Sequence, residues 1–427
     1  MACWALSHLI GNATENLDVF GGHALATRLA ALVEQLPDEH LDSDLVWLDQ
    51  IFQRAGAVSD RHLQSVVGQR MVRLTGETYD DDANAWSAWM YAKALVVTSA
   101  YHTAVHDTDR VINHLTEAHR VLSSWVDEDM DLDQLSTWDD IIHGLSRCLV
   151  ERGDFDNAIA TLHELVALSD RIKAKAPDRI LWMYCRARAL SSLGQVQGKL
   201  GQTEQAMSSL TESLGLLRQL GAVSMLGEVV EMFCATAFAL SYQAKRSGDL
   251  DMESTLLDEA TDVAQHLADR VDIDAHRTLL AQALVRRGRL WQRRERRDNA
   301  RHDAMRALQL YEQNMNTVWP PYDGLGMQYE QLATLELADG NLEQARAYAS
   351  DACRWLRMDV ARTSEPDAIA RLLIALITQG EIERQAGNMT AVKELVIEAE
   401  ARMNALPESY AEILKGTKDR LSALSCH

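Results

Sequence analysis

A short turn signal recurs along the chain at a nearly constant spacing. Gly153 stands between two stretches whose apolar residues follow a helical period, and Ala158 comes early in the second stretch. The arrangement returns at steps of 48, 47, 47, 45 and 47 residues, giving the turn residues Gly153, Gly201, Gly248, Glu295, Gly340 and Gly387. Repetition at such a period is typical of stacked units, because one hairpin cannot bury its apolar face alone. The sequence therefore predicts an array of helical hairpins.

The same interval leads backwards to His106, Gly56 and Gly11, where a weaker signal still joins two helical stretches. Hydrophobic residues make up 47% of the chain, so it can bury a core. We predict an all-α solenoid of about nine antiparallel helix-turn-helix hairpins, as a single domain over residues 1–427. Its parts are degenerate N-terminal repeats in 1–139, clearer repeats in 140–405 and a C-terminal capping helix in 406–427.

The prolines agree with this register. Each falls between two predicted hairpins, at Pro37, Pro177, Pro320, Pro321, Pro366 and Pro407. Proline in a helix interior costs about 3 kcal/mol, so it is expected in the linkers of a helical array.

Small residues around the turns resemble the tetratricopeptide repeat. Gly194, the turn residue Gly201 and Ala206 match a small residue in the first helix, the turn glycine and an early alanine in the second. Two further sets match in the same way: Gly288, Ala300 and Ala307, and Ala333, Gly340, Ala345, Ala349 and Ala352. The resemblance covers residues 140–405 well and 1–139 poorly. The unit here is longer than the usual repeat of about 34 residues.

The resemblance implies that the first helix of each hairpin lines a concave groove that binds a protein or peptide. Counting back from the turns projects polar, cationic and aromatic side chains onto that groove. They are His143, Arg147, Arg188, Gln195, Lys199, Phe238, Tyr242, Lys245, Arg246, Arg289 and Arg293. Arginine forks suit carboxylates, and the aromatic rings could hold an apolar anchor. We expect the groove to hold an acidic segment or a free C-terminal carboxylate of a partner protein.

Residues 286–306 strengthen this expectation, since nine arginines stand there against Glu295, Asp298 and Asp303. The alternative interpretation is a solvated helix face, on which the cations pair at i,i+4 with local acids.

The formal net charge of −21 makes direct nucleic-acid or anionic-membrane binding unexpected, because the long-range field repels phosphate. The cysteines are widely spaced, without a C-x-x-C pair, which favours a reducing cytoplasm over a disulfide framework. The first residues have neither a basic n-region nor a long apolar run, so we expect no signal peptide or membrane span there.

The sequence contains only incomplete matches to metal-binding motifs. His102 and His106 are four apart but lack the glutamate of an H-E-x-x-H motif. The acids Asp129, Asp131, Asp133 and Asp140 have EF-hand-like spacing, but Gln134 stands where the sharp turn needs glycine.

Ser136 and Thr137, with Asp139 and Asp140 behind them, instead resemble capping boxes at a helix start. No nucleotide-binding motif or nucleophile elbow is present. We expect no metal, no cofactor and no enzymatic activity.

Two other functions stay open. One is a ligand- or peptide-sensing regulatory module of a bacterial transcription or signalling regulator. The other is an α/α-toroid carbohydrate-active enzyme, which would need a pocket with converging carboxylates in a closed ring. Trp182, Trp291 and Trp355 lie in apolar helical periods, where core packing is expected. The apolar start of the chain, with Trp4, Leu6, Leu9 and Ile10, suggests a homodimer contact or a covered end.

Overall fold

The structure of the chain is a computed structural model. It describes residues 19–35, 48, 50–52, 61–104, 107–125, 132–175, 177–178, 180–223, 227–315, 320–363, 366–406 and 414–425. Within these ranges every regular element is an α-helix, which confirms the all-α class. The chain divides into two compact units, Met1–Leu216 and Leu217–His427, and each is described by itself.

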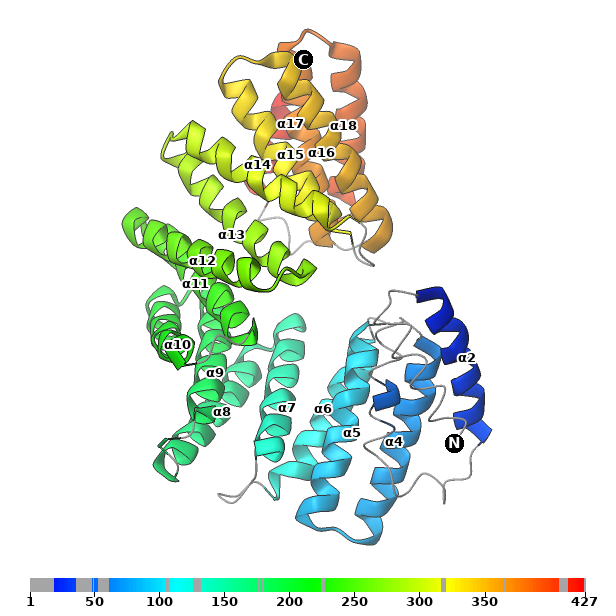
Figure 1. Cartoon of the computed structure of the whole chain (residues 1–427). Coiled ribbons are helices and arrows are strands. Elements are labelled where there is room, and N and C mark those ends of the chain that lie inside the picture. The colour runs from blue at the N-terminus through cyan, green and yellow to red at the C-terminus, as the bar shows by residue number, and fades with distance from the viewer. Residues whose placement is uncertain are drawn as a thin grey trace. The chain divides into compact units, whose positions relative to one another are not determined.

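The first unit contains a series of helices packed against their sequence neighbours (Figure 1). They are α2 (Val19–Gln35), α4 (Arg61–Asp81), α5 (Ala85–Ala104), α6 (Thr108–Ser123), α7 (Leu132–Glu151), α8 (Phe155–Lys175), α9 (Leu181–Lys199) and α10 (Thr203–Val223), whose last turns lie past the unit boundary. The first helices of successive hairpins also touch, α5 with α7 and α7 with α9. This pattern is that of an α-solenoid.

The second unit repeats the arrangement. Its helices are α11 (Gly227–Ser247), α12 (Leu250–Arg270), α13 (Asp274–Arg293), α14 (Arg297–Gln313), α15 (Tyr322–Ala338), α16 (Leu342–Thr363), α17 (Pro366–Gln385), α18 (Met389–Asn404) and α19 (Lys415–Ser425). Here α11, α13, α15 and α17 form the inner contacts, and α19 lies against α17 and α18. Leu421 and Leu424 of α19 join the apolar cluster around Leu372.

Seven hairpins, from α5–α6 to α17–α18, lie in the part of the chain that the structure describes. The predicted turns at Gly11, Gly56 and His106 lie outside the described residues, as do Pro37, Pro407 and the apolar N-terminal residues Trp4, Leu6, Leu9 and Ile10. Pro366 is the first residue of α17, where its missing N–H is no loss. None of the described helices is both long and apolar enough to cross a membrane.

The six predicted turn residues have the backbone that the repeat requires. They are the described residues with positive φ: Gly153 (77°), Gly201 (78°), Gly248 (80°), Glu295 (58°), Gly340 (82°) and Gly387 (76°). The next residue donates its N–H to the carbonyl five positions back, as Asp154 does to Leu149 at 2.8 Å and Arg296 to Trp291 at 2.9 Å. This left-handed cap ends each first helix and satisfies a terminal carbonyl.

The small residues of the repeat lie where two helices approach closely. A Cβ added at Gly194 of α9 would lie 2.6 Å from Leu210 Cγ and 3.1 Å from the carbonyl oxygen of Ala206. At Gly326 of α15 an added Cβ would lie 2.4 Å from Leu356 Cγ. The alanines on the second helices are buried as well, as Ala206 and Ala345 are. Side chains at these positions would hold the two helices of a hairpin apart.

One expectation about local structure is wrong. Ser136 and Thr137 do not start a helix, because α7 begins at Leu132 and contains both. The buried residues Leu135, Trp138 and Ile142 carry the apolar face of α7 through this segment. Because residues 132–140 are helical, the acidic spacing that ends at Asp140 does not form a calcium-binding loop there; Asp129 and Asp131 lie outside the described residues.

The three tryptophans differ from one another. Trp182 is buried, as predicted. Trp291 and Trp355 are only half-buried, and arginine guanidinium groups cover them: that of Arg296 lies 5.6 Å from the centroid of Trp291, and that of Arg354 lies 4.7 Å from that of Trp355.

Candidate functional site

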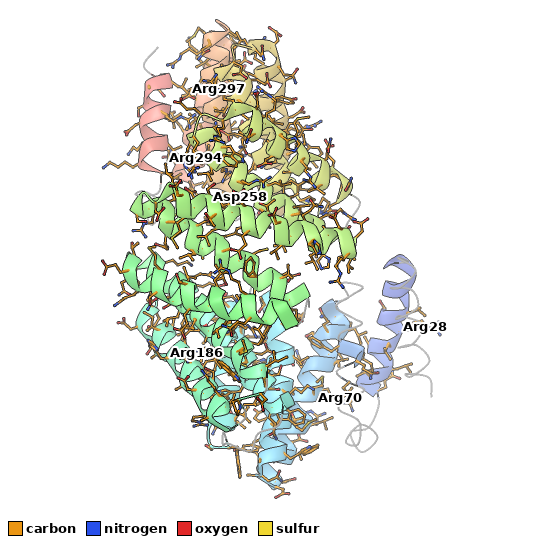
Figure 2. All side chains as sticks on the ribbon, turned by 60° about the vertical axis from the view of Figure 1, so that its left-hand side comes forward. Arg28, Arg70, Arg186, Asp258, Arg294 and Arg297 are labelled. Atoms are coloured by element: carbon orange, nitrogen blue, oxygen red, sulfur yellow. The ribbon has the colours of Figure 1, made fainter. Side chains whose placement is uncertain are left out.

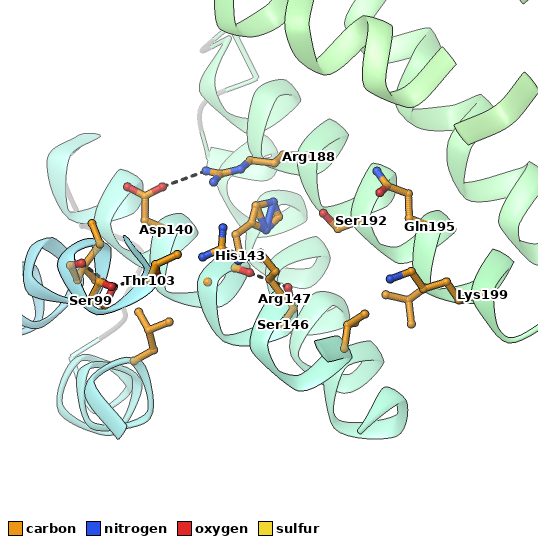
Figure 3. A pocket seen from close by; sticks show the side chains of 16 residues that line it. Ser99, Thr103, Asp140, His143, Ser146, Arg147, Arg188, Ser192, Gln195 and Lys199 are labelled. Carbon is orange, nitrogen blue, oxygen red and sulfur yellow. Dashed lines mark hydrogen bonds and ion pairs between the residues drawn. The ribbon is translucent and has the colours of Figure 1, made fainter. Parts of the chain in front are cut away.

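The first unit contains a cavity of about 600 Å³ between α5, α7 and α9 (Figure 3). Five of the residues projected onto the groove line it together: His143, Arg147, Arg188, Gln195 and Lys199. Helical geometry explains why they meet. Residues three, four or seven apart share one face of a helix, and the inner faces of α7 and α9 lie against each other.

Arg188 is fixed in the wall of the cavity by two aspartates. Its Nη1 donates to Asp139, which is 2% exposed, and to Asp140 Oδ1 at 3.1 Å. Burial raises the pKa of Asp139 to about 6, although the charge of Arg188 opposes this rise. The second oxygen of Asp139 is buried without a partner. Arg188 therefore compensates a buried carboxylate, which the sequence projection did not reveal.

His143 lies between Arg147 and Arg188 in the view of Figure 3. Burial, and then the charges of these two arginines, lower its pKa well below the usual value for histidine. Both ring nitrogens are buried and neither has a hydrogen-bond partner. At neutral pH His143 is therefore an uncharged imidazole in the cavity wall, with one N–H and one lone pair unused.

Arg147 and Lys199 are the cations of the cavity that are not neutralised. Both are exposed, and neither forms an ion pair with any residue that the structure describes. Gln195 extends the same face, and its amide donates to Ser191 Oγ at 3.3 Å. The cavity lining has a single carboxylate, that of Asp140. The lining thus carries a net positive charge on a chain that is strongly acidic.

The opposite wall, formed by α5, is polar but uncharged. The Ser99 hydroxyl donates to the Val96 carbonyl at 2.6 Å, and the Thr103 hydroxyl donates to the Ser99 carbonyl at 3.0 Å. Their protons are used within the helix, so these hydroxyls offer the cavity only lone pairs. A ligand in the cavity would therefore meet cations on one side and acceptors on the other.

The repeat pattern agrees with the comparisons with known proteins. The family model of the tetratricopeptide repeat matches residues 187–216, which include most of α9, the Gly201 turn and most of α10. The chain therefore contains a tetratricopeptide repeat. Its repeats are longer than usual, with helices of 16 to 22 residues in the seven described hairpins. No curated protein sequence matches the chain.

Two solved structures resemble this repeat protein in fold. One is a signal-transduction ATPase with numerous domains and a tetratricopeptide-repeat sensor, from Pyrococcus horikoshii, with a TM-score of 0.55 and 14% identity. The alignment covers 93% of this chain and 55% of the ATPase chain, so this chain spans about half the length of that protein. The other is the apo form of RapI, with a TM-score of 0.50 and 11% identity, over 84% of this chain and 98% of RapI.

The remaining predicted groove residues lie on α11 and α13, in the second unit of the repeat protein. Phe238 is buried beneath the guanidinium of Arg286, which lies 4.6 Å from the ring centroid. Tyr242 is 53% exposed, and Lys245 and Arg246 are exposed at the end of α11. The roles of these residues in binding stay predictions.

Five of the nine arginines in segment 286–306 form ion pairs with described residues. Arg287 donates two hydrogen bonds of 2.8 Å to the carboxylate of Asp303. Arg293 donates to the buried Glu253. Arg294 donates to Asp251 at 3.0 Å. Arg297 and Arg301 reach Asp339 and Glu336 on the next hairpin. Figure 2 marks Arg294, Arg297 and also Asp258, whose carboxylate lies 3.5 Å from Arg287. Most partners lie on a neighbouring hairpin, not at i,i+4, so the local excess of arginine overstates the free positive charge.

Proposed function

We propose that this chain is a protein-binding scaffold that holds an acidic segment or a C-terminal carboxylate of a partner in the cavity between α5, α7 and α9. The observation that carries the proposal is the pair of unneutralised cations, Arg147 and Lys199, at the cavity. The tetratricopeptide-repeat fold supports a protein-interaction role in general.

The chemistry of the lining favours a small anionic group over other ligands. Arg147 and Lys199 can each donate to a carboxylate oxygen, and charge-assisted hydrogen bonds of this kind contribute about 1.5–3 kcal/mol each. The ion pairs with Asp139 and Asp140 fix the side chain of Arg188 in the cavity wall. The cavity volume of about 600 Å³ suits a few side chains of a peptide.

The test uses fluorescein-labelled peptides that are rich in Asp and Glu, with a free or an amidated C-terminus, and reads binding by fluorescence anisotropy. The Arg147→Gln/Lys199→Gln variant should bind at least about 30-fold more weakly than the wild type, since it loses two charge-assisted bonds. Arg188 is a poor probe, because removing it would leave the buried Asp139 uncompensated.

A matched control removes the same charge elsewhere. Arg171 on α8 and Lys393 on α18 are exposed and form no ion pair within the described ranges. The Arg171→Gln/Lys393→Gln variant should bind like the wild type. If both variants bind the peptide equally weakly, only the overall charge of the protein matters. If Arg147→Gln/Lys199→Gln binds as tightly as the wild type, the cavity is excluded as the binding site. Loss on amidation alone would identify the C-terminal carboxylate as the recognised group.

A second candidate is a sensing module, favoured by the fold likeness to a protein whose repeats are described as a sensor. A sensor must change conformation when its ligand binds, whereas a scaffold need not. Hydrogen exchange of α5 to α10 with and without a bound acidic peptide separates the two. Altered exchange beyond the helices that line the cavity would favour the sensor. The homodimer and the cytoplasmic location stay predictions.

A further inference from the structure

Two arginines on α13 differ from their neighbours. Arg287 and Arg293 of the same helix are bound to Asp303 and Glu253. Arg286 and Arg289 are exposed, and neither forms an ion pair with an acid in the described part of the chain. They are three residues apart, so they project from one face of α13. A protein with 63 acidic residues leaves these two cations unneutralised.

The surroundings of the two guanidinium groups are aromatic and apolar. Arg286 lies over the Phe238 ring of α11, and Arg289 Nη2 lies 3.7 Å from the sulfur of Met327 on α15. Although part of the Arg286 side chain is exposed, burial of its guanidinium and then the charge of Arg289 lower its pKa, whereas Tyr311 acts to raise it. Like charges three residues apart repel each other, so this arrangement costs stability unless an anion shares it.

The hydroxyl of Tyr311 is a third polar group, and the charges of Arg286 and Arg289 influence it. Tyr311 of α14 is 3% exposed, and the charges of both arginines act to lower its pKa, although burial, as the largest effect, raises it. Its hydroxyl has no hydrogen-bond partner among the described residues. The charge of Asp323 also raises the pKa of Tyr311. An unused hydroxyl donor thus lies near two unneutralised guanidinium groups.

We propose that Arg286, Arg289 and Tyr311 form an oxyanion site in the second unit that binds a doubly charged phosphate-monoester group. Two guanidinium forks match a dianion, whereas one carboxylate would neutralise only half of their charge. This site shares no residue with the cavity of the first unit, so it stands independently of the function proposed above.

The experiment titrates the full chain with phenyl phosphate at low ionic strength, followed by isothermal titration calorimetry. Benzoate serves as the singly charged analogue with the same ring. The wild type should bind phenyl phosphate at least tenfold more tightly than benzoate at pH 7.5. The preference should shrink at pH 5, because the second ionisation of a phosphate ester has a pKa of about 6.

Two variants locate the binding. Arg286→Gln/Arg289→Gln should weaken phenyl phosphate binding at least tenfold, and Arg289→Gln alone, which disturbs only the contact with Met327, should weaken it by a smaller factor. Arg296→Gln/Arg306→Gln removes the same charge from the same segment and should bind like the wild type, since neither arginine forms an ion pair within the described ranges. Circular dichroism confirms that each variant is folded.

Unchanged affinity in Arg286→Gln/Arg289→Gln, or benzoate binding as tight as phenyl phosphate, would overturn the proposal. Binding that is lost equally in both double variants would also overturn it. Arg147→Gln/Lys199→Gln should leave phenyl phosphate binding unchanged. The proposal for this site can therefore be contradicted independently of the proposal for the cavity. Inorganic phosphate and N-acetyl-phosphotyrosine amide then distinguish the source: tighter binding of the amide indicates a phosphorylated side chain, and equal binding indicates free phosphate.

Discussion

At the scale of single residues, two kinds of glycine hold the hairpins together for different reasons. Gly201 has a φ of 78°, so its left-handed backbone conformation favours glycine. Gly194 has helical backbone, but its Cα faces Leu210 and the Ala206 carbonyl of the partner helix. Gly215 on α10 has neither constraint. The three positions lie within 22 residues of chain and make a matched set.

Alanine substitutions should separate these reasons. Gly201→Ala should lower the free energy of unfolding by about 1 kcal/mol, because a Cβ is strained in the left-handed region. Gly215→Ala should raise it by about 0.5–1 kcal/mol, because alanine is the better helix former. Urea unfolding followed by circular dichroism measures both. A Gly201→Ala protein as stable as the wild type would show that the turn can relax into another conformation.

Glu295 shows how far sequence could go at this scale. The spacing of the other turns predicted that Glu295 occupies a turn without glycine, and its φ of 58° agrees. Backbone conformation is a local property, so a repeat signal is enough to predict it. The free-energy cost of the positive φ at Glu295 cannot be predicted from the sequence. That cost depends on how firmly the flanking helices α13 and α14 constrain the turn.

At the scale of helices, ion pairs between neighbouring hairpins escaped prediction. Arg188 binds Asp139 from 49 positions away, and Arg293 binds Glu253 from 40 positions away. Such separations equal about one repeat, so they depend on how one hairpin lies on the next. The sequence predicted which helix faces carry arginine, but not which of these arginines an acid would neutralise. Arg147 and Lys199 could be told from Arg188 only in the folded chain.

The pair between α7 and α9 gives a quantitative test. Arg188→Met should destabilise the chain by about 3 kcal/mol at pH 7.5, because Asp139 stays buried without its cation. Adding Asp139→Asn should recover part of this loss. Asp140→Asn, which changes a half-exposed partner, should cost less than about 1 kcal/mol. Denaturant unfolding of the four proteins measures these differences.

The pH dependence of this effect has a definite sign. Burial already raises the pKa of Asp139 to about 6 in the folded chain, above its ordinary value of 3.8, and loss of Arg188 raises it further. The folded state then binds more protons than the unfolded state, so stability falls as pH rises through the folded pKa. Arg188→Met should therefore cost less at pH 5 than at pH 7.5. An equal cost at both values would mean that water reaches Asp139 in the variant.

At the scale of the whole molecule, packing is local along the sequence. The apolar clusters around Leu63 and Trp138 lie in the first unit, and those around Leu372 and Ile382 lie in the second. Helices touch their immediate neighbours and the next first helix, as α13 touches α15. In repeat proteins of this kind, stability is close to a sum of unit and nearest-neighbour terms.

Local packing predicts how far a perturbation spreads. Gly194→Ala would place a Cβ 2.6 Å from Leu210 Cγ and 3.1 Å from the Ala206 carbonyl, and overpacking of this kind costs about 1–3 kcal/mol. Hydrogen exchange measured by mass spectrometry should rise in α7 to α10 and stay unchanged in α15 to α18. A Cβ added at Gly215 has no atom within 4 Å, so Gly215→Ala should raise hydrogen exchange in neither region. A uniform rise across both regions would mean that the chain unfolds as one cooperative body instead of repeat by repeat.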